Sequence, residues 1–129
     1  MLVFHTAPIG YLGPDRLDIT RGSGIAGAGI LFAPSWTILR PARQRLNAGT
    51  MTPAKWAAYA NAYTDEMRRS YRYNREEWDA LLERPRVVAV CYCDIRPPRP
   101  PWCHRRVLAG ILVKLGATDA GELPDVDVG

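Results

Sequence analysis

The sequence predicts an α/β fold: a small three-layer, sandwich-like domain with a mostly parallel central sheet and flanking helices. Three observations support this class. The length of 129 residues suits one domain with a core of its own. The run Val87 to Cys91 is continuously apolar and rich in β-branched residues, which is typical of a strand buried on both faces. Helical patterns also alternate with strand patterns along the chain, as they do in parallel sheets.

The first half of the chain is strand-like. Leu2 to His5 is a short apolar run before a turn-rich stretch, which predicts an opening strand. Arg16 to Thr20 alternates between polar and apolar residues and predicts a second strand. Ile30 to Phe32 and Trp36 to Leu39 are apolar segments on either side of Pro34, and they predict another strand or extended segment.

Two helices are expected next. Thr52 and Pro53 form a helix start, because threonine caps free amides and proline suits the first helical position. The following residues place one apolar stripe at three- and four-residue steps: Trp56, Tyr59, Ala60, Tyr63 and Met67. Asn74 and Glu77 resemble a capping box, which predicts a second helix ending before Pro85.

The last part reads as strand, loop and helix. The buried strand at 87–91 leads into a proline-rich loop at 96–101, and Trp102 or Cys103 then opens a helix. Gly116 provides the C-terminal stop of that helix. We therefore expect a single domain over residues 1–117, followed by an acidic C-terminal tail at 118–129.

Composition narrows the function class. The formal net charge is +4, with fifteen arginines and two lysines, and arginine forks bind phosphate and carboxylate groups well. No apolar stretch approaches the ~20 residues of a membrane-spanning helix, and the start lacks a signal-peptide pattern, so no membrane association is expected. The three cysteines fall at 91, 93 and 103, a cluster unlike a disulfide framework. The chain is therefore expected to be cytoplasmic.

A glycine-rich segment matches a short nucleotide-binding pattern. Gly22, Gly24 and Gly27 fit G-x-G-x-x-G after a predicted strand. A dinucleotide site also needs a helix opening inside the motif and an acidic residue about 20 positions later, whereas Pro34 arrives early and no acidic residue occurs between Asp18 and Asp65. The segment therefore predicts a flexible loop whose amides, beside Arg21, approach a phosphate.

The strongest candidate site is the segment from Cys91 to Arg106. Ligands of parallel sheets bind beyond the carboxyl ends of the strands, and Cys91 is expected at such an end. The N-terminus of a helix attracts anions and stabilises thiolates. Cys103, His104 and Arg105 are expected at such a helix start. Cys91, Cys103 and His104 are the predicted catalytic residues, and Arg105 is a predicted ligand-binding residue.

Two alternatives use other residues or other chemistry. Zinc could be bound by four residues, Cys91, Cys93, Cys103 and His104. Their spacing departs from the C-x2–4-C pairs of structural sites, so no metal site or cofactor is predicted. The segment from Arg68 to Arg75 mixes arginines with tyrosines, a pattern that fits either a solvated helix face or a nucleic-acid surface.

The motif order resembles the bacterial and phage family of domain of unknown function 488. The resemblance covers about residues 15–117 and is carried by Asp18-Ile-Thr-Arg21, Tyr63-Thr-Asp-Glu66-Met67, the strand ending at Cys91, and Cys103-His104-Arg105. This chain differs in carrying Cys93 where an acidic residue is common, and in the lengthened loop at 96–101. The family implies a compact α/β domain with the arginine and Cys-His-Arg groups near one another, and it implies no reaction.

The leading hypothesis is therefore an anion pocket that binds a nucleotide or nucleic-acid phosphate, with thiol-dependent chemistry if the protein is an enzyme. The ligand-binding residues expected are Asp18, Arg21, Tyr63, Glu66 and Arg105. The alternatives are a non-enzymatic phage-type protein that binds a host protein or nucleic acid, and a zinc-stabilised structural module. The expected partner is an anionic small molecule or a nucleic acid.

Overall fold

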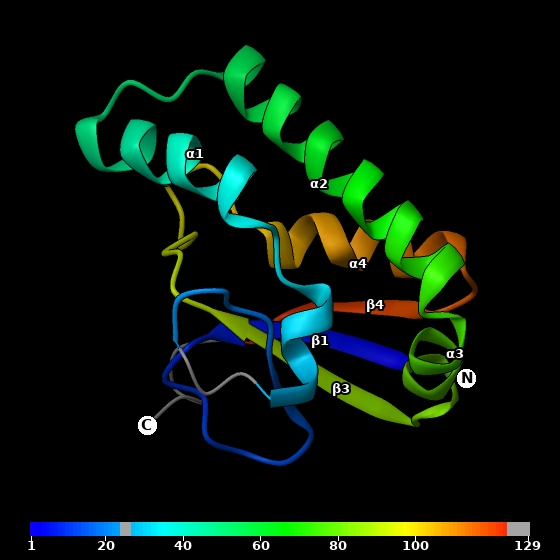
Figure 1. Cartoon of the computed structure of the whole chain (residues 1–129). Helices are drawn as coiled ribbons and strands as arrows, with labels where there is room; N and C mark the ends of the chain where they lie inside the picture. Colours follow the sequence, from blue (N-terminus) through cyan, green and yellow to red (C-terminus); the bar gives the residue numbers. More distant parts are fainter. Residues whose placement is uncertain (24–26, 124–129) are drawn as a thin grey trace.

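A computed structural model describes residues 1–23 and 27–123, and it contains one four-stranded parallel sheet (Figure 1). The strands lie in the order β2-β3-β1-β4. The α/β class and the parallel sheet are thus confirmed. In chain order the elements are β1 (Val3–Pro8), β2 (Arg16–Asp18), the 3-10 helix η1 (Gly27–Phe32), α1 (Trp36–Ala48), α2 (Pro53–Tyr73), α3 (Arg75–Glu83), β3 (Arg86–Cys91), α4 (His104–Lys114) and β4 (Thr118–Glu122).

The two faces of the sheet are covered differently. Alternate residues of β3 point to opposite faces, so Val87 and Cys91 join the large core cluster while Val88 and Val90 join a small one. The large cluster receives side chains from every helix of the described part, and these helices lie on that face (Figure 1). Tyr11 covers the small cluster from the β1–β2 loop. The third layer is therefore a loop instead of a helical layer.

Local signals explain the helices that the sequence predicted. The Thr52 hydroxyl accepts a hydrogen bond from the Lys55 amide at 3.1 Å, and Pro53 opens α2. The positive φ of 102° at Gly116 follows the end of α4. Helix α3 begins after Asn74 as expected, but the capping box is wrong, because the Asn74 side chain donates to the Ser70 hydroxyl instead.

The prediction of a strand at 30–32 and 36–39 is wrong. The first segment lies in η1 and the second opens α1, which begins directly after Ser35. The carboxylate of Glu66 on α2 accepts hydrogen bonds from the backbone N–H and the hydroxyl of Ser35. A side chain distant in sequence thus satisfies a donor at this helix start. Pro34 and Pro41 obscure the helical pattern in the sequence.

The expected boundary at residue 117 lies inside the folded domain. Thr118–Glu122 forms β4, which pairs in parallel with β1 and completes the sheet. The segment is polar, contains Gly121 and is mostly exposed, so it lacks the apolar alternation of a half-buried strand. Of the glycine motif at 22–27, residues 24–26 lie outside the described part. No helix in the described ranges has the length and apolarity needed to span a membrane.

Candidate functional site

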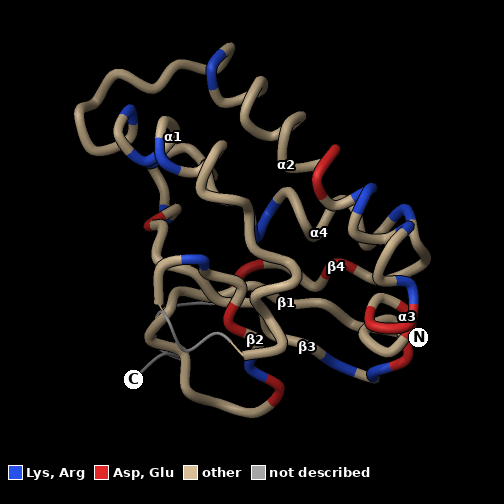
Figure 2. Tube along the Cα trace, in the orientation of Figure 1, with Lys and Arg blue, Asp and Glu red and all other residues tan. Residues whose placement is uncertain are grey.

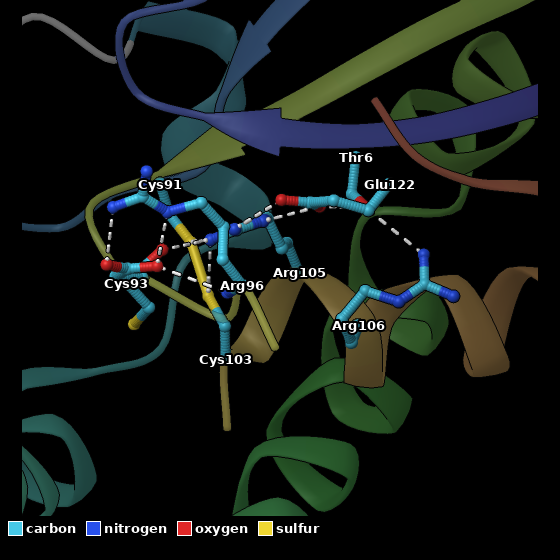
Figure 3. Close-up of polar contacts among 9 residues, drawn as sticks. Thr6, Cys91, Cys93, Arg96, Cys103, Arg105, Arg106 and Glu122 are labelled. Atoms are coloured by element: carbon cyan, nitrogen blue, oxygen red, sulfur yellow. Dashed lines mark hydrogen bonds and ion pairs between the residues drawn. A yellow bond between two sulfur atoms is a disulfide. The ribbon is translucent and has the colours of Figure 1, made fainter. Parts of the chain in front are cut away.

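The candidate site is built around Arg105, in the first turn of α4. Its side chain is fully buried, and Nη1 donates to the Sγ atoms of Cys91 at 3.0 Å and Cys103 at 3.2 Å (Figure 3). The same nitrogen donates to the carbonyl oxygen of Cys93 at 2.9 Å. One guanidinium thus fixes the end of β3, the loop that follows it and the N-terminus of α4.

The charge of Arg105 is balanced by Glu122 at the end of β4. Arg105 Nε donates to Oε1 at 3.0 Å and Nη2 donates to Oε2 at 2.6 Å, a bidentate pair. The Thr6 hydroxyl on β1 donates to the same Oε1 at 2.6 Å and accepts from Arg106 Nη1 at 3.1 Å. A buried guanidinium requires such pairing, since an isolated charge in the core is costly.

The cysteines occupy two environments. Cys91 and Cys103 are buried and joined as a disulfide, with their Cα atoms 7.9 Å apart. Cys103 is also the N-cap residue of α4. Cys93 is a free thiol and partly buried, and burial is the main cause that raises its pKa. The prediction that the clustered cysteines form no disulfide is therefore wrong for Cys91 and Cys103, because the end of β3 and the start of α4 bring their sulfurs together.

His104 lies beside this pair as a neutral ring. Its Nε2 is 2.8 Å from the carbonyl oxygen of Ile19, and Tyr63 meets the ring edge-on at 5.5 Å between centroids. Burial is the main cause that lowers the pKa of His104 to about 4. Because a carbonyl only accepts, Nε2 carries the proton of the neutral ring and Nδ1 carries the lone pair.

A pocket of about 400 Å³ opens next to the cysteine pair, between α1, the start of α2 and the loop after β3. Cys91 and His104 line its wall. Its basic and aromatic lining comprises Arg21, Arg43, Arg99, Trp56, Tyr59, Tyr92 and Trp102. Trp56 and Trp102 stack at 6.2 Å between centroids with 24° between their planes. Burial raises the pKa of the Tyr59 hydroxyl, which therefore stays protonated.

Two of the expected ligand-binding residues lie near this pocket. Arg21 lines it, and its guanidinium also donates to the carbonyl oxygens of Pro34 at 3.0 Å and Ala33 at 3.3 Å. Asp18 is buried, and its Oδ1 accepts hydrogen bonds from the Thr20 amide and hydroxyl. Its Oδ2 is buried and has no hydrogen-bond partner in the described part of the chain.

The other expected ligand-binding residues make internal contacts and do not line the pocket. The Tyr63 hydroxyl donates to the carbonyl oxygen of Phe32 at 2.6 Å, and Glu66 binds Ser35 at the start of α1. Arg105 is occupied by Glu122 and the two sulfurs. The structure thus brings Cys91, Cys103, His104 and Arg105 together, and it places Tyr63 and Glu66 in contacts that support the helices.

Two residues of the site, Glu122 and Arg43, were not predicted from the sequence. Glu122 was missed because it lies in the segment expected to be a tail. Arg43 was missed because α1 was not recognised. The sequence did contain a signal for Glu122. An arginine at a buried position needs a carboxylate partner, and the chain offers few acidic residues after Arg105 from which to choose it.

The structure reduces the four-residue zinc hypothesis to three residues. Ligand atoms of Cys91, Cys103 and His104 all lie within 4.8 Å of one another, and all three residues are buried. Among the described residues Cys93 is not part of this group.

The comparisons with known proteins give a family. A family model described as DUF488-N3a, active DUF488-N3 subclade, matches residues 30–116 and confirms the resemblance noted from the sequence. No match was found among curated proteins or among solved structures.

Proposed function

The chain belongs to the DUF488-N3a family, the active DUF488-N3 subclade, and from this premise we propose that its pocket binds a nucleotide or a nucleotide unit of a nucleic acid and acts on it. One observation supports this most directly. A single pocket wall combines arginines, stacked aromatic rings, a sulfur and an imidazole. The description of the subclade as active agrees with a catalytic role.

The arginines suit the phosphate. Arg21, Arg43 and Arg99 reach the pocket from the segment after β2, from α1 and from the proline-rich loop. Arg99 also pairs with Asp94 at 3.0 Å, which restrains its position at the rim. Guanidinium groups converging from separate segments bind phosphate through charge-assisted, bidentate hydrogen bonds.

The aromatic residues suit the base. The stacked pair Trp56 and Trp102 presents indole rings beside the phenol of Tyr59, whose ring is 5.0 Å from that of Trp56. Base–aromatic stacking contributes about 1–3 kcal/mol per base and tolerates different bases. The pocket volume of about 400 Å³ falls in the range of small-molecule sites, roughly 300–1,000 Å³.

The reacting end of the pocket is the cluster of Cys91, Cys103 and His104. Thiol-dependent chemistry there requires that the Cys91–Cys103 disulfide first be reduced. Two molecules of a small thiol supply the two electrons and two protons, giving two cysteine thiols and one small-molecule disulfide. Of the two disulfide-bonded cysteines, Cys91 lines the pocket and Cys103 does not, so Cys91 is the one of this pair that a ligand meets.

Ligand binding by arginine variants tests the proposal. The reduced protein is titrated with adenosine monophosphate, a short single-stranded oligonucleotide and inorganic phosphate, with tryptophan fluorescence and calorimetry as readouts. Arg21→Ala and Arg43→Ala are expected to weaken nucleotide binding about tenfold or more, the effect of losing one charge-assisted hydrogen bond. Arg45→Ala is the matched control, since Arg45 lies on α1 outside the pocket lining. Parental affinity in both pocket variants would remove the proposal.

A second candidate function rests on a separate surface. A groove between α2 and α4 is lined by Tyr71 and by four basic residues: Arg68, Arg72, Arg75 and Lys114. Figure 2 shows basic positions gathered along the C-terminal end of α2. Such a surface fits a non-enzymatic, phage-type protein that binds the backbone of a nucleic acid. In that case oligonucleotide affinity falls steeply with added salt and depends on Arg72, whereas the pocket arginines have little effect.

A further inference from the structure

We infer that the reduced cluster of Cys91, Cys103 and His104 binds a thiophilic divalent metal ion of the zinc class. This inference goes beyond the proposed function, because metal binding needs only these three side chains. A catalytic role of the bound ion, in contrast, rests on the proposed function of the pocket. The starting observation is that two sulfurs and one imidazole nitrogen from β3 and the start of α4 converge within 4.8 Å.

The spacing of the group suits a shared ion. Tetrahedral zinc with Zn–S bonds of about 2.3 Å places two thiolates roughly 3.8 Å apart, so the two sulfurs that the disulfide joins must move apart to bind it. The Cα atoms of Cys91 and Cys103 are 7.9 Å apart, wider than the ~4.4–6.8 Å usual for disulfide-linked residues. The backbone therefore leaves room for the two sulfurs to separate around an ion once they are reduced.

The local charge balance fits a divalent cation. Glu122 already neutralises Arg105 through two hydrogen bonds, so that guanidinium does not offset two further negative charges. Without an ion the two buried cysteines stay neutral thiols, whereas a divalent ion displaces their two protons, so that its charge and those of the two thiolates cancel. Zinc has this charge, and Arg105 Nη1, which donates to both sulfurs, becomes the outer-shell donor that orients them (Figure 3).

His104 is held in the arrangement of a metal ligand. Its Nε2–H donates to the Ile19 carbonyl, which fixes the ring and leaves the Nδ1 lone pair for coordination. Metal-bound histidines commonly donate their other ring N–H to a backbone carbonyl or carboxylate in this way. The protein thus presents a Cys2His set with its outer-shell hydrogen bonds already in place.

The fourth coordination position faces the pocket. Cys91 and His104 line the pocket wall, so an ion between them is accessible from the cavity. Three protein ligands and one open position distinguish catalytic zinc sites from closed structural ones. A water or ligand oxygen would occupy that position, next to the arginines proposed to hold the phosphate.

Cobalt substitution tests the site. The full-length protein is reduced by a phosphine under anaerobic conditions. The phosphine is oxidised to its oxide, and one water molecule supplies the oxygen atom and the two protons of the cysteine thiols. The reduced protein is then titrated with Co²⁺. We expect one equivalent to bind and to produce the near-ultraviolet charge-transfer band of cobalt thiolates, which one equivalent of Zn²⁺ abolishes. Cys91→Ser and Cys103→Ser are expected to weaken binding at least 100-fold. Cys93→Ser is the matched control and is expected to retain the band.

Several results would overturn the inference. The reduced parent protein could show no thiolate band, or Cys93→Ser could lose it as completely as Cys91→Ser. Alkylation of the unsubstituted, reduced protein by iodoacetamide does not depend on how the variants fold. Compared with the metal-free protein, bound Zn²⁺ must protect Cys91 and Cys103, but not Cys93, from alkylation. Metal binding without nucleotide binding would remove the proposed function alone, and nucleotide binding without metal binding would remove this inference alone.

Discussion

At the scale of single residues, Arg105 and Arg106 are neighbours in sequence with different surroundings. Arg105 is fully buried and holds two sulfurs, a carbonyl and Glu122. Arg106 pairs with Asp119 at 2.6 Å, and both of these side chains are about one quarter exposed. The contrast gives a matched comparison between a buried ion pair and one at the rim.

Arg105→Met is expected to lower the free energy of unfolding by about 3 kcal/mol or more, because it leaves the Glu122 carboxylate partly buried without its partner. Arg106→Met is expected to cost about 1 kcal/mol or less, since solvent screens its pair with Asp119. Urea unfolding of the reduced proteins measures both values. Equal losses in the two variants would contradict the role assigned to Arg105.

The pH dependence of stability includes a contribution from Asp119. Burial alone favours the neutral acid, but the Arg106 guanidinium and the Gly121 amide together lower the pKa of Asp119 below its usual value. Because the pKa of Asp119 is lower in the folded state than in the unfolded state, its ionised carboxylate stabilises the fold above about pH 4. This stabilisation is lost as the pH falls through the folded-state pKa. Asp119→Asn should therefore be less stable near pH 7, by about 1 kcal/mol or less, and the difference from the parent should shrink in acid. A constant difference across the acid limb of urea titrations would contradict this.

The sequence predicted the polar cluster better than it predicted the pairing inside it. Cys91, Cys103, His104 and Arg105 could be placed together because a strand end and the following helix start are neighbours at the carboxyl edge of a parallel sheet. Glu122 could not be placed there, since its approach depends on β4 pairing with β1, which starts the chain. Local patterns carry little information about such long-range pairings.

At the scale of elements, η1 packs against β2 with almost no space between their backbones. A Cβ built on Gly29 would lie 1.8 Å from the carbonyl oxygen of Asp18, so only glycine fits. Gly110, in the middle of α4, is exposed and a Cβ there would meet nothing within 4 Å. The two glycines therefore have opposite expected responses to alanine.

Gly29→Ala is expected to destabilise the protein by about 2 kcal/mol or more, because the backbone of η1 or β2 must move to admit the methyl group. Gly110→Ala is expected to stabilise it by about 0.5–1 kcal/mol, since alanine loses less conformational freedom in a helix. Urea midpoints of both variants at one pH give the comparison. An unchanged urea midpoint in Gly29→Ala would show that η1 and β2 leave room for a methyl group at this position.

The helices also show which elements can be read from the sequence. Helix α2 was predictable because its cap, its first-turn proline and its apolar stripe agree. Helix α1 was missed because its start depends on Glu66, which lies 31 positions after Ser35, and because Pro41 interrupts the pattern. β3 was predictable from its continuous apolar run, whereas the polar edge strand β4 was not.

At the scale of the whole molecule, the topology gathers the site from both ends of the chain. β1 lies between β3 and β4 (Figure 1). Hydrogen bonds therefore connect Thr6 on β1, Glu122 at the end of β4 and, through Arg105, Cys91 at the end of β3 (Figure 3). The first and last strands are therefore part of the same hydrogen-bonded network as the cysteines.

A chain ending at Ala117 tests this dependence. It loses β4, exposes the edge of β1 and leaves Arg105 without a carboxylate, so we expect it to lack a cooperative unfolding transition. Full-length Glu122→Gln removes only the charge and should still fold, with a loss of about 2 kcal/mol. Circular dichroism during heating and gel filtration distinguish the two proteins. If the shortened chain unfolds cooperatively at the temperature of Glu122→Gln, the domain would end at residue 117 after all and β4 would be an accessory strand. If the shortened chain shows no cooperative transition, β4 is required for the fold. It is then also required for the cysteine cluster, because its Glu122 carboxylate pairs with the Arg105 that holds both sulfurs.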